Sequence, residues 1–200
     1  MNPLGLPPVG EPPPPPWREV FGRDAPLEVD VGFGKGLFLT DRAREAPNVN
    51  VVGIEQRLKW VLATRGRIER ERLPNASVMD GEAVYRITRS FQPGEVSRFY
   101  VFFPDPWWKR RHQRRRLWTP AFAALLTERL CPGGILYAQT DVAEYSQQIL
   151  QILENAPGLQ NASGPRQLAA WQGEIPPSPR ERTYLQNGMP YYQMKYVRLG

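Results

Sequence analysis

Residues 27–36 read LEVDVGFGKG, in which apolar and acidic residues alternate and then give way to three closely spaced glycines. The first five residues have the composition and alternation of a short strand. Glycines permit a tight turn and a close approach of a ligand, both of which a Cβ atom would prevent. An apolar helix-forming stretch follows at 37–46. The segment therefore predicts a strand, a glycine turn and a helix, the unit that opens a ligand-binding α/β sheet.

The same alternation of strand and helix continues along the chain. Strands joined by helices become parallel neighbours through right-handed crossovers. The run RFYVFF is continuously apolar, as in strands covered on both faces. We therefore expect an α/β fold, a Rossmann-like open sheet with helices on both faces and an antiparallel C-terminal strand. The further strands are expected at 51–54, weakly at 77–79, and at 98–103, 135–140 and 191–199, and the helices at 57–72, 120–130 and 142–155.

The length of 200 residues suits one domain of ordinary size. Eight of the first 16 residues are proline, which excludes a helix interior or a central strand there. We expect a proline-rich mobile N-terminal arm over 1–25 and a single domain over 26–200. Residues 157–182, rich in Gly, Pro, Ser and Gln, are expected to form a long loop.

Composition excludes several classes of protein. Cys131 is the only cysteine and His112 the only histidine, so an internal disulfide, a thiolate metal cluster and an imidazole-rich metal site are excluded. The mean hydropathy is −0.50. No stretch approaches the roughly 18 apolar residues of a spanning helix. The N-terminus also lacks the pattern of a secretory signal. We expect no metal, no membrane contact and a cytoplasmic location.

The net charge of the chain is compatible with binding to nucleic acid. Lys and Arg number 26 against 20 acidic residues, which gives a net charge of +6. Only four of these cations are lysines, so 22 are arginines. The planar fork of arginine suits phosphate and stacks on bases. Genome composition explains such an arginine bias equally well, so the distribution of the charge is more informative than its total.

Acidic residues are expected beside the glycine turn. Ligands of such sheets bind beyond the carboxyl ends of the strands. Asp30 precedes the turn, and Glu55 ends the second strand, where a carboxylate can accept both hydroxyls of a ribose. The spacing G-x-G-x-G, with Leu37 next, departs from the dinucleotide pattern G-x-G-x-x-G. These acids suit an adenosine that bears an amino acid and a sulfonium better than a pyrophosphate. The alternatives are simple turn chemistry and a surface carboxylate.

The most informative stretch is FPDPWWKRRHQRRR at 103–116, after the apolar strand. Asp105 lies between two prolines, which hold it rigidly at the carboxyl end of the strand. Two indoles and six cations follow. Cations suit an RNA backbone and aromatic planes suit unstacked bases, so this stretch indicates an RNA-binding rim. The alternative is that the basic run is only a solvated face.

From these motifs the chain resembles the tRNA (guanine-N7-)-methyltransferases, which are class I S-adenosylmethionine-dependent enzymes. The resemblance covers roughly residues 26–200. It rests on VGFGKG, on GIE at 53–55, on FPDPWWKRRHQRRRL at 103–117, on QTD at 139–141 and on ERTYLQNG at 181–188. It implies transfer of a methyl group from S-adenosylmethionine to N7 of the variable-loop guanine at tRNA position 46. The oligomeric state, monomer or homodimer, stays open.

The resemblance also assigns residues. It implies a place near the adenine for Glu82, with Asp80 as an alternative. Gln186 replaces a glutamate of the family, and Trp108 replaces the more frequent Pro or His. Cofactor contacts are implied at Asp30, Gly32, Gly34, Gly36, Glu55, Glu82 and Asp105. Substrate contacts are implied at Lys109, Asp141, Thr183, Tyr184, Leu185 and Gln186, and the basic run offers tRNA backbone contacts at Arg110, Arg111, Arg114, Arg115 and Arg116.

The chemistry of N7 explains why this set contains no general base. Guanine N7 carries a lone pair and no proton, so no base is needed to form the nucleophile. The enzyme must align N7, the methyl group and sulfur, and stabilise the positive charge that moves onto the guanine. Asp105 is the candidate for this catalytic role, and Asp141 is a candidate for holding the N1–H and exocyclic amine of guanine. The rival hypotheses are a nicotinamide oxidoreductase, disfavoured by the glycine spacing, and a non-catalytic RNA-binding module on a nucleotide-binding fold.

Overall fold

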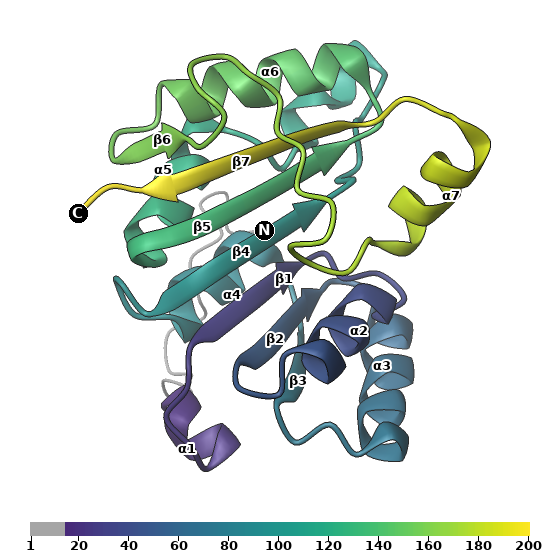
Figure 1. Ribbon diagram of the computed structural model, residues 1–200, viewed down its shortest axis with the longest axis vertical. Coiled ribbons are helices and arrows are strands. Elements are labelled where there is room, and N and C mark those ends of the chain that lie inside the picture. Colours follow the sequence, from purple (N-terminus) through teal and green to yellow (C-terminus); the bar gives the residue numbers. More distant parts are fainter. Residues whose placement is uncertain (1–14) are drawn as a thin grey trace.

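The computed structural model describes residues 15–200, apart from the side chains of Arg110 and Gln113. Within this part of the chain, one sheet has the strand order β3-β2-β1-β4-β5-β7-β6 (Figure 1). Strands β1 to β5 are parallel, and β7 runs antiparallel between β5 and β6. The predicted fold class is confirmed. The strands are β1 (Leu27–Val31), β2 (Asn50–Glu55), β3 (Ala76–Asp80), β4 (Val96–Phe102), β5 (Leu130–Thr140), β6 (Leu159–Asn161) and β7 (Tyr192–Arg198).

Helices cover both faces of this sheet, and α7 lies beyond the carboxyl ends of the parallel strands (Figure 1). Helices α2 and α3 contact each other, while α5 contacts both α4 and α6. Across the described residues, no helix is long and apolar enough to cross a bilayer. The helices are α1 (Trp17–Phe21), α2 (Leu37–Glu45), α3 (Leu58–Glu71), α4 (Ala83–Ser90), α5 (Pro120–Arg129), α6 (Ala143–Glu154), α7 (Pro179–Asn187) and the 3-10 helix η1 (Arg110–Arg115).

The elements with clear sequence signals lie where they were expected. Helix α5 begins with proline in its first turn, and the Thr119 hydroxyl accepts a hydrogen bond from the Phe122 N–H at 3.1 Å. Short elements were missed. Strand β6 and the start of α7 lie inside the expected loop 157–182, and neither α1 nor α4 was expected. These segments have few residues, so their structure depends on tertiary contacts more than on periodicity.

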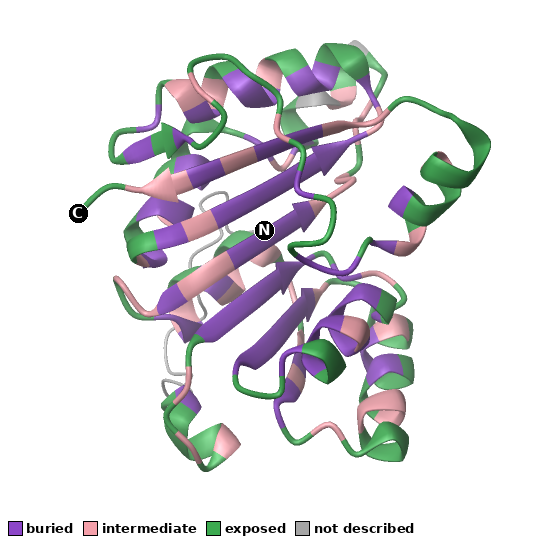
Figure 2. Ribbon diagram, in the orientation of Figure 1, coloured by how far each residue is buried: buried purple, intermediate pink, exposed green. Residues whose placement is uncertain are grey.

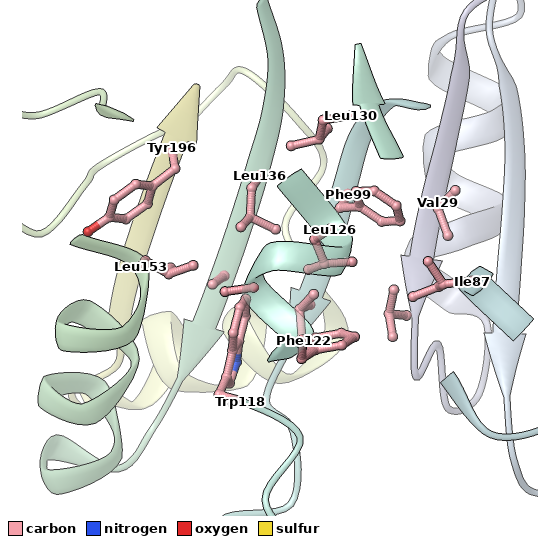
Figure 3. Packing of buried hydrophobic residues seen from close by; sticks show 14 of the residues in the cluster. Val29, Ile87, Phe99, Trp118, Phe122, Leu126, Leu130, Leu136, Leu153 and Tyr196 are labelled. Atoms are coloured by element: carbon pink, nitrogen blue, oxygen red, sulfur yellow. The ribbon is translucent and has the colours of Figure 1, made fainter. Parts of the chain in front are cut away.

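The largest apolar cluster lies between the sheet and helices α4 to α6. Side chains of the central strands, such as Val29 and Leu136, meet Phe122 and Leu126 of α5 there (Figure 3). A second cluster lies between the sheet and helices α2 and α3. The central strands are therefore buried along most of their length (Figure 2). This burial fixes the positions of the strand ends, where the functional residues are expected.

Helix α1 lies within the segment 1–25 that was expected to be a mobile arm. The Trp17 ring is stacked on Phe91 with centroids 5.3 Å apart, and its Nε1 donates a hydrogen bond to the Ser90 carbonyl at 2.7 Å. Arg23 donates to the Asn50 side chain at 2.8 Å. Residues 17–23 are therefore attached to the domain, whereas the prolines among the first 14 residues lie outside the described part.

We predict that Trp17→Ala lowers the free energy of unfolding by about 3 kcal/mol, because it removes a large buried aromatic side chain and leaves a cavity. Urea denaturation measures this change. Val20 of the same helix is 44% exposed, so Val20→Ala provides a control with an effect below about 0.5 kcal/mol. Equal stability of the Trp17→Ala protein and the parent would show that α1 does not contribute to the fold.

Candidate active site

The carboxyl ends of β1 to β5 bring most of the predicted site residues to one edge of the sheet. The glycine turn follows β1, Glu55 ends β2, and Asp80 ends β3. Asp105 and Asp141 follow β4 and β5. The strand order changes direction between β1 and β4, which is where open α/β sheets bind ligands.

Backbone geometry explains the glycines of the turn. Gly32, Gly34 and Gly36 have φ angles of 75°, 57° and 69°, a left-handed conformation that favours glycine. A Cβ atom at Gly36 would also lie 2.3 Å from Oγ1 of the buried Thr64 on α3. The turn therefore requires glycine both for its conformation and for the close packing of α3.

Glu55 connects the end of β2 to the glycine turn. Its Oε2 accepts a hydrogen bond from the Gly34 N–H at 3.0 Å, and its Oε1 accepts one from the Arg57 N–H at 2.8 Å. Each carboxylate oxygen retains a further acceptor position. Glu55 is half-buried, so its carboxylate is fixed in position and still accessible to a ligand.

Asp30 is buried immediately before the same turn. It is 3% exposed, and its Oδ2 has no hydrogen-bond partner among the described residues. Burial raises the pKa of this carboxyl from 3.8 to about 8, and the negative charge of Glu55 adds to the shift. A buried acceptor without a partner costs free energy, and a cationic ligand group would remove that cost.

The two candidates after β3 have different environments. The Glu82 carboxylate accepts hydrogen bonds from the Val84 N–H at 3.0 Å and the Tyr85 N–H at 2.8 Å, and so caps α4. The Asp80 side chain is 57% exposed, and its carboxylate lies 4.0 Å from the Arg86 guanidinium. Asp80 has the freer carboxylate, whereas Glu82 has a structural role in addition to any contact with a ligand.

The loop after β4 carries Asp105 in an unusual backbone. Phe103 and Trp107 have φ angles of 49° and 46°, which are strained for side chains of this size. The Phe103 N–H donates to the Gln139 carbonyl at 2.8 Å, which attaches the start of the loop to β5. Asp105 itself is exposed. The loop thus presents a carboxylate to solvent from a constrained backbone.

The basic run follows this loop and forms η1. Lys109, Arg111, Arg114 and Arg115 are exposed. The Arg115 guanidinium lies 5.1 Å from the centroid of the Trp107 ring. Cations and an aromatic plane therefore lie close together beside Asp105, as the sequence predicted, although the side chain of Arg110 is outside the described part.

Arg116 differs from the rest of the basic run. It was expected among the residues that contact the tRNA backbone, but it is buried. Its Nε donates to the Pro106 carbonyl at 2.7 Å, and its Nη1 donates to Oε1 of Gln148 on α6 at 2.5 Å. The expectation of a phosphate contact is corrected, because these protein contacts enclose the guanidinium.

The remaining substrate candidates meet between β5 and α7. The Tyr184 hydroxyl donates to Oδ2 of Asp141, and the Arg180 guanidinium lies 3.9 Å from the same oxygen. The Tyr184 ring is stacked on Phe103 with centroids 6.0 Å apart, which brings α7 to the Asp105 loop. Thr183, Leu185 and Gln186 are exposed on α7.

Glu181 attaches α7 to the sheet. It is buried, accepts hydrogen bonds from Gln139 of β5 at 2.8 Å and Gln193 of β7 at 3.1 Å, and completes a capping box with Ser178. Sequence reasoning missed this role, although the S-x-x-E pattern at 178–181 was available as a signal of a helix start.

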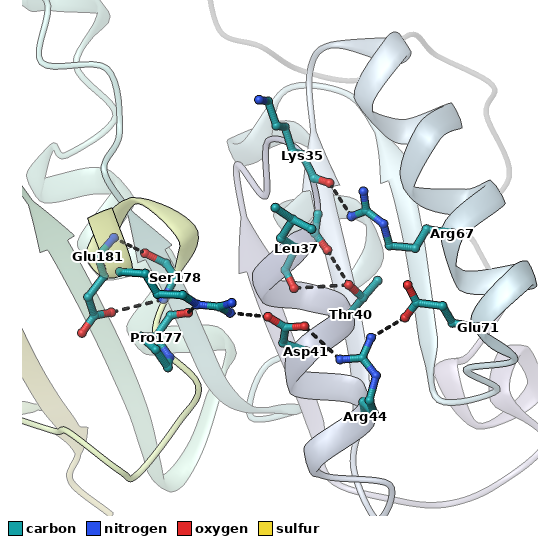
Figure 4. Close-up of polar contacts among 12 residues, drawn as sticks. Lys35, Leu37, Thr40, Asp41, Arg44, Arg67, Glu71, Pro177, Ser178 and Glu181 are labelled. Atoms are coloured by element: carbon teal, nitrogen blue, oxygen red, sulfur yellow. Dashed lines mark hydrogen bonds and ion pairs between the residues drawn. The ribbon is translucent and has the colours of Figure 1, made fainter. Parts of the chain in front are cut away.

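A chain of ion pairs connects α7 to the helix after the glycine turn. Arg182 of α7 pairs with Asp41 of α2. Arg44, one turn further along α2, pairs with Asp41 at 2.9 Å and with Glu71 of α3 (Figure 4). The segment assigned to the substrate and the helix that follows the cofactor turn are therefore in direct contact. The approach of Arg180 to Asp141 and the stacking of Phe103 on Tyr184 were also missed, because only the folded chain brings these residues together.

Comparisons with known proteins show what this chain is similar to. A family model described as a putative methyltransferase matches residues 24–194. A tRNA (guanine-N(7)-)-methyltransferase of Myxococcus xanthus is 37% identical over 98% of this chain and 95% of its own length. One of Anaeromyxobacter dehalogenans is 40% identical over 92% of each chain.

Solved structures support the fold. An aminoglycoside resistance methyltransferase aligns with a TM-score of 0.62 at 15% identity, over 92% of each chain. A SAM-dependent methyltransferase of Aquifex aeolicus aligns with a TM-score of 0.60 at 15% identity, over 90% of this chain and 87% of that one. At this identity the likeness concerns the fold alone.

Asp30 makes the stability of the ligand-free chain depend on pH. Its pKa is higher in the folded chain than in the unfolded one, so the folded state binds more protons between pH 3.8 and about 8. The free energy of unfolding therefore falls as the pH rises through this window, by at most about 1.4 kcal/mol per pH unit from this one group.

We predict that Asp30→Asn reduces this decline, and that the variant is more stable than the parent at pH 8 without ligand. Urea denaturation at several pH values between 5 and 8 measures the effect. The exposed Asp24 provides the control, because Asp24→Asn is expected to keep the decline of the parent. An Asp30→Asn protein with the same pH dependence as the parent would contradict a buried, protonated Asp30.

Proposed function

We propose that this chain, which belongs to the tRNA (guanine-N(7)-)-methyltransferase family, transfers a methyl group from S-adenosylmethionine to N7 of the guanine at position 46 of tRNA. One observation carries the choice of cofactor. The unpartnered buried oxygen of Asp30 lies immediately before a glycine turn that is held by Glu55. An adenosine with a cationic amino-acid group fits these two acceptors, since its ribose hydroxyls and its ammonium group both donate hydrogen bonds.

Different residues at this edge of the sheet are proposed to bind different parts of the cofactor. Glu55 has acceptor positions left for the ribose hydroxyls. Asp30 can accept a hydrogen bond from the ammonium group, which would favour its ionised form. Asp80 or Glu82 would accept from the adenine amine. When bound, S-adenosylmethionine supplies a methyl group that its sulfonium has already activated.

Asp105 has the chemistry needed for the transfer step. Positive charge moves from sulfur to the guanine ring as the methyl group is transferred, and a fixed carboxylate close to that path stabilises the transition state. Guanine N7 has no proton to lose, so Asp105 need not act as a base. Its contribution is electrostatic, together with the alignment that the constrained loop provides.

Asp141 is suited to recognise the guanine. A carboxylate can accept from N1–H and the exocyclic amine at the same time, a pair of donors that adenine lacks. One of its oxygens is already bonded to Tyr184, which orients the group. The Tyr184 ring, which is stacked on Phe103, lies next to it and offers a surface on which a base can stack.

The exposed cations of η1 are proposed to bind the tRNA backbone. Arg111, Arg114 and Arg115, with Lys109 before them, lie beside the Asp105 loop and would neutralise phosphates next to the target nucleotide. As an enzyme that acts on tRNA, the protein would work in the cytoplasm. A non-catalytic RNA-binding module would not need the acidic groups at the ends of β1, β2 and β4.

We predict that Asp105→Asn lowers single-turnover methylation of tRNA by roughly 10²- to 10³-fold, because it removes the charge while it keeps the shape. Calorimetry is expected to show little change in affinity for tRNA. The parent rate between pH 6 and 9 should show no titration of a base, and His112→Gln should cost little. Full activity of Asp105→Asn would limit this residue to a structural role.

We predict that Arg114→Ala with Arg115→Ala weakens tRNA binding and flattens its dependence on salt. Each phosphate contact that is lost reduces the slope of log K against log salt by about 0.7 to 0.9. Calorimetry should show that affinity for S-adenosylmethionine is unchanged. Arg18, exposed on α1, gives the control variant Arg18→Ala. If the double variant shows the same slope of log K against log salt as the parent, the basic run has no role in RNA binding.

A further inference from the structure

Arg116 is a buried guanidinium at the end of an exposed basic run, and it contacts the loop that carries Asp105. We propose that Arg116 is a positioning residue, which fixes the 103–108 loop so that Asp105 lies in the place where methyl transfer needs it. The inference rests on the proposed function for its catalytic consequence. The structural part of it, the attachment of the loop, can be tested without methylation.

The contacts of Arg116 extend in different directions from one planar group. Nε donates to the Pro106 carbonyl at 2.7 Å, and Nη1 donates to Oε1 of Gln148 at 2.5 Å. The guanidinium also lies 4.8 Å from the ring centroid of the buried Tyr145. Nη2 is 4.0 Å from Oε1 of Glu144. Arg116 therefore connects the loop to α6, because Gln148 and Tyr145 belong to that helix.

The Asp105 carboxylate depends on such an attachment. Among the described residues, no hydrogen bond or ion pair holds this carboxylate directly, so the backbone on either side sets its position. Before it, the Phe103 N–H is bonded to the Gln139 carbonyl at 2.8 Å. After it, the Pro106 carbonyl is bonded to Arg116. Asp105 lies between these two fixed points.

The backbone of this loop also needs external support. Phe103 and Trp107 both have positive φ angles, a conformation that costs of order 1 kcal/mol or more for each residue. Such strain persists only where surrounding contacts hold it. The Gln139 carbonyl accepts from Phe103 itself, and Arg116 donates to the carbonyl of Pro106, directly before Trp107, so these two bonds hold the backbone at or next to both strained residues.

Charge supports the same arrangement. Burial raises the pKa of the Tyr145 phenol, the Asp105 carboxylate adds to this shift, and the Arg116 guanidinium opposes it. Asp105 and Arg116 are therefore both close enough to Tyr145 to influence its titration. Arginine suits this position better than lysine, since its planar fork bonds in two directions while an ammonium acts as a point charge.

The test compares Arg116→Ala with Arg114→Ala, which removes an exposed cation from the same run. For Arg116→Ala we expect a fall in kcat of about 10²-fold, the effect of a displacement of the order of 1 Å. The salt dependence of tRNA binding and the affinity for S-adenosylmethionine should stay close to those of the parent. Guanidinium ion, added below denaturing concentrations, should restore part of the lost rate. Arg114→Ala should instead flatten the salt dependence of tRNA binding, and guanidinium ion should not rescue that change.

Hydrogen exchange tests the attachment independently of activity. We expect Arg116→Ala to raise exchange at the Phe103 amide, which donates to the Gln139 carbonyl, and Gln148→Leu to raise it less while the fold is kept. If Arg116→Ala does not fold, Gln148→Leu and Arg116→Lys carry the same test. Unchanged exchange, or a flatter salt dependence with an unchanged kcat, would overturn the proposal. A parent enzyme that does not methylate tRNA would refute the proposed function, and the exchange result would still decide whether Arg116 holds the loop.

Discussion

The hydrogen bond from the Gly34 N–H to the Glu55 carboxylate links the glycine turn after β1 to the end of β2. The geometry of the proposed cofactor site depends on this bond. It requires a glycine turn in left-handed conformation, because only this backbone directs the N–H toward β2. It also requires β1 and β2 to be parallel and in register, which the crossover through α2 provides. Asp30 then lies beneath the turn with one oxygen unpartnered. The packing of the sheet thus determines where the acids can meet a ligand.

Charge is separated within the molecule. The net charge is +6, yet the ends of the parallel strands carry acids, which include Asp30, Glu55 and Asp141. The exposed cations of η1 follow the loop that carries Asp105. The separation matches the two proposed ligands, since S-adenosylmethionine carries cationic groups and tRNA carries phosphates. The ion pair between Arg182 and Asp41 connects α7, which carries the proposed substrate residues, with α2, the helix after the glycine turn.

Sequence patterns predicted the elements whose structure is determined by residues that are close together in the chain. The strand and glycine turn at 27–36 and the apolar strand before Asp105 could be recognised because periodicity and glycine spacing are local. The prediction of a long loop at 157–182 was wrong where β6 and α7 occur. Strand β6 has only three residues, and α7 is attached to the sheet through the buried Glu181, so both depend on tertiary partners. Arg116 could not be told from its neighbours, because all the arginines of a basic run look alike until the chain is folded. The assignments of site residues stay predictions.

The central claim is that this site methylates N7 of one guanine, and mass analysis of nucleosides tests it most directly. Unmodified tRNA is incubated with the protein and S-adenosylmethionine that carries a deuterated methyl group, then digested. The account predicts labelled 7-methylguanosine, from a single variable-loop position, and no label when that guanine is replaced by 7-deazaguanine. Label in another nucleoside, or no label in tRNA although the cofactor binds, would contradict it.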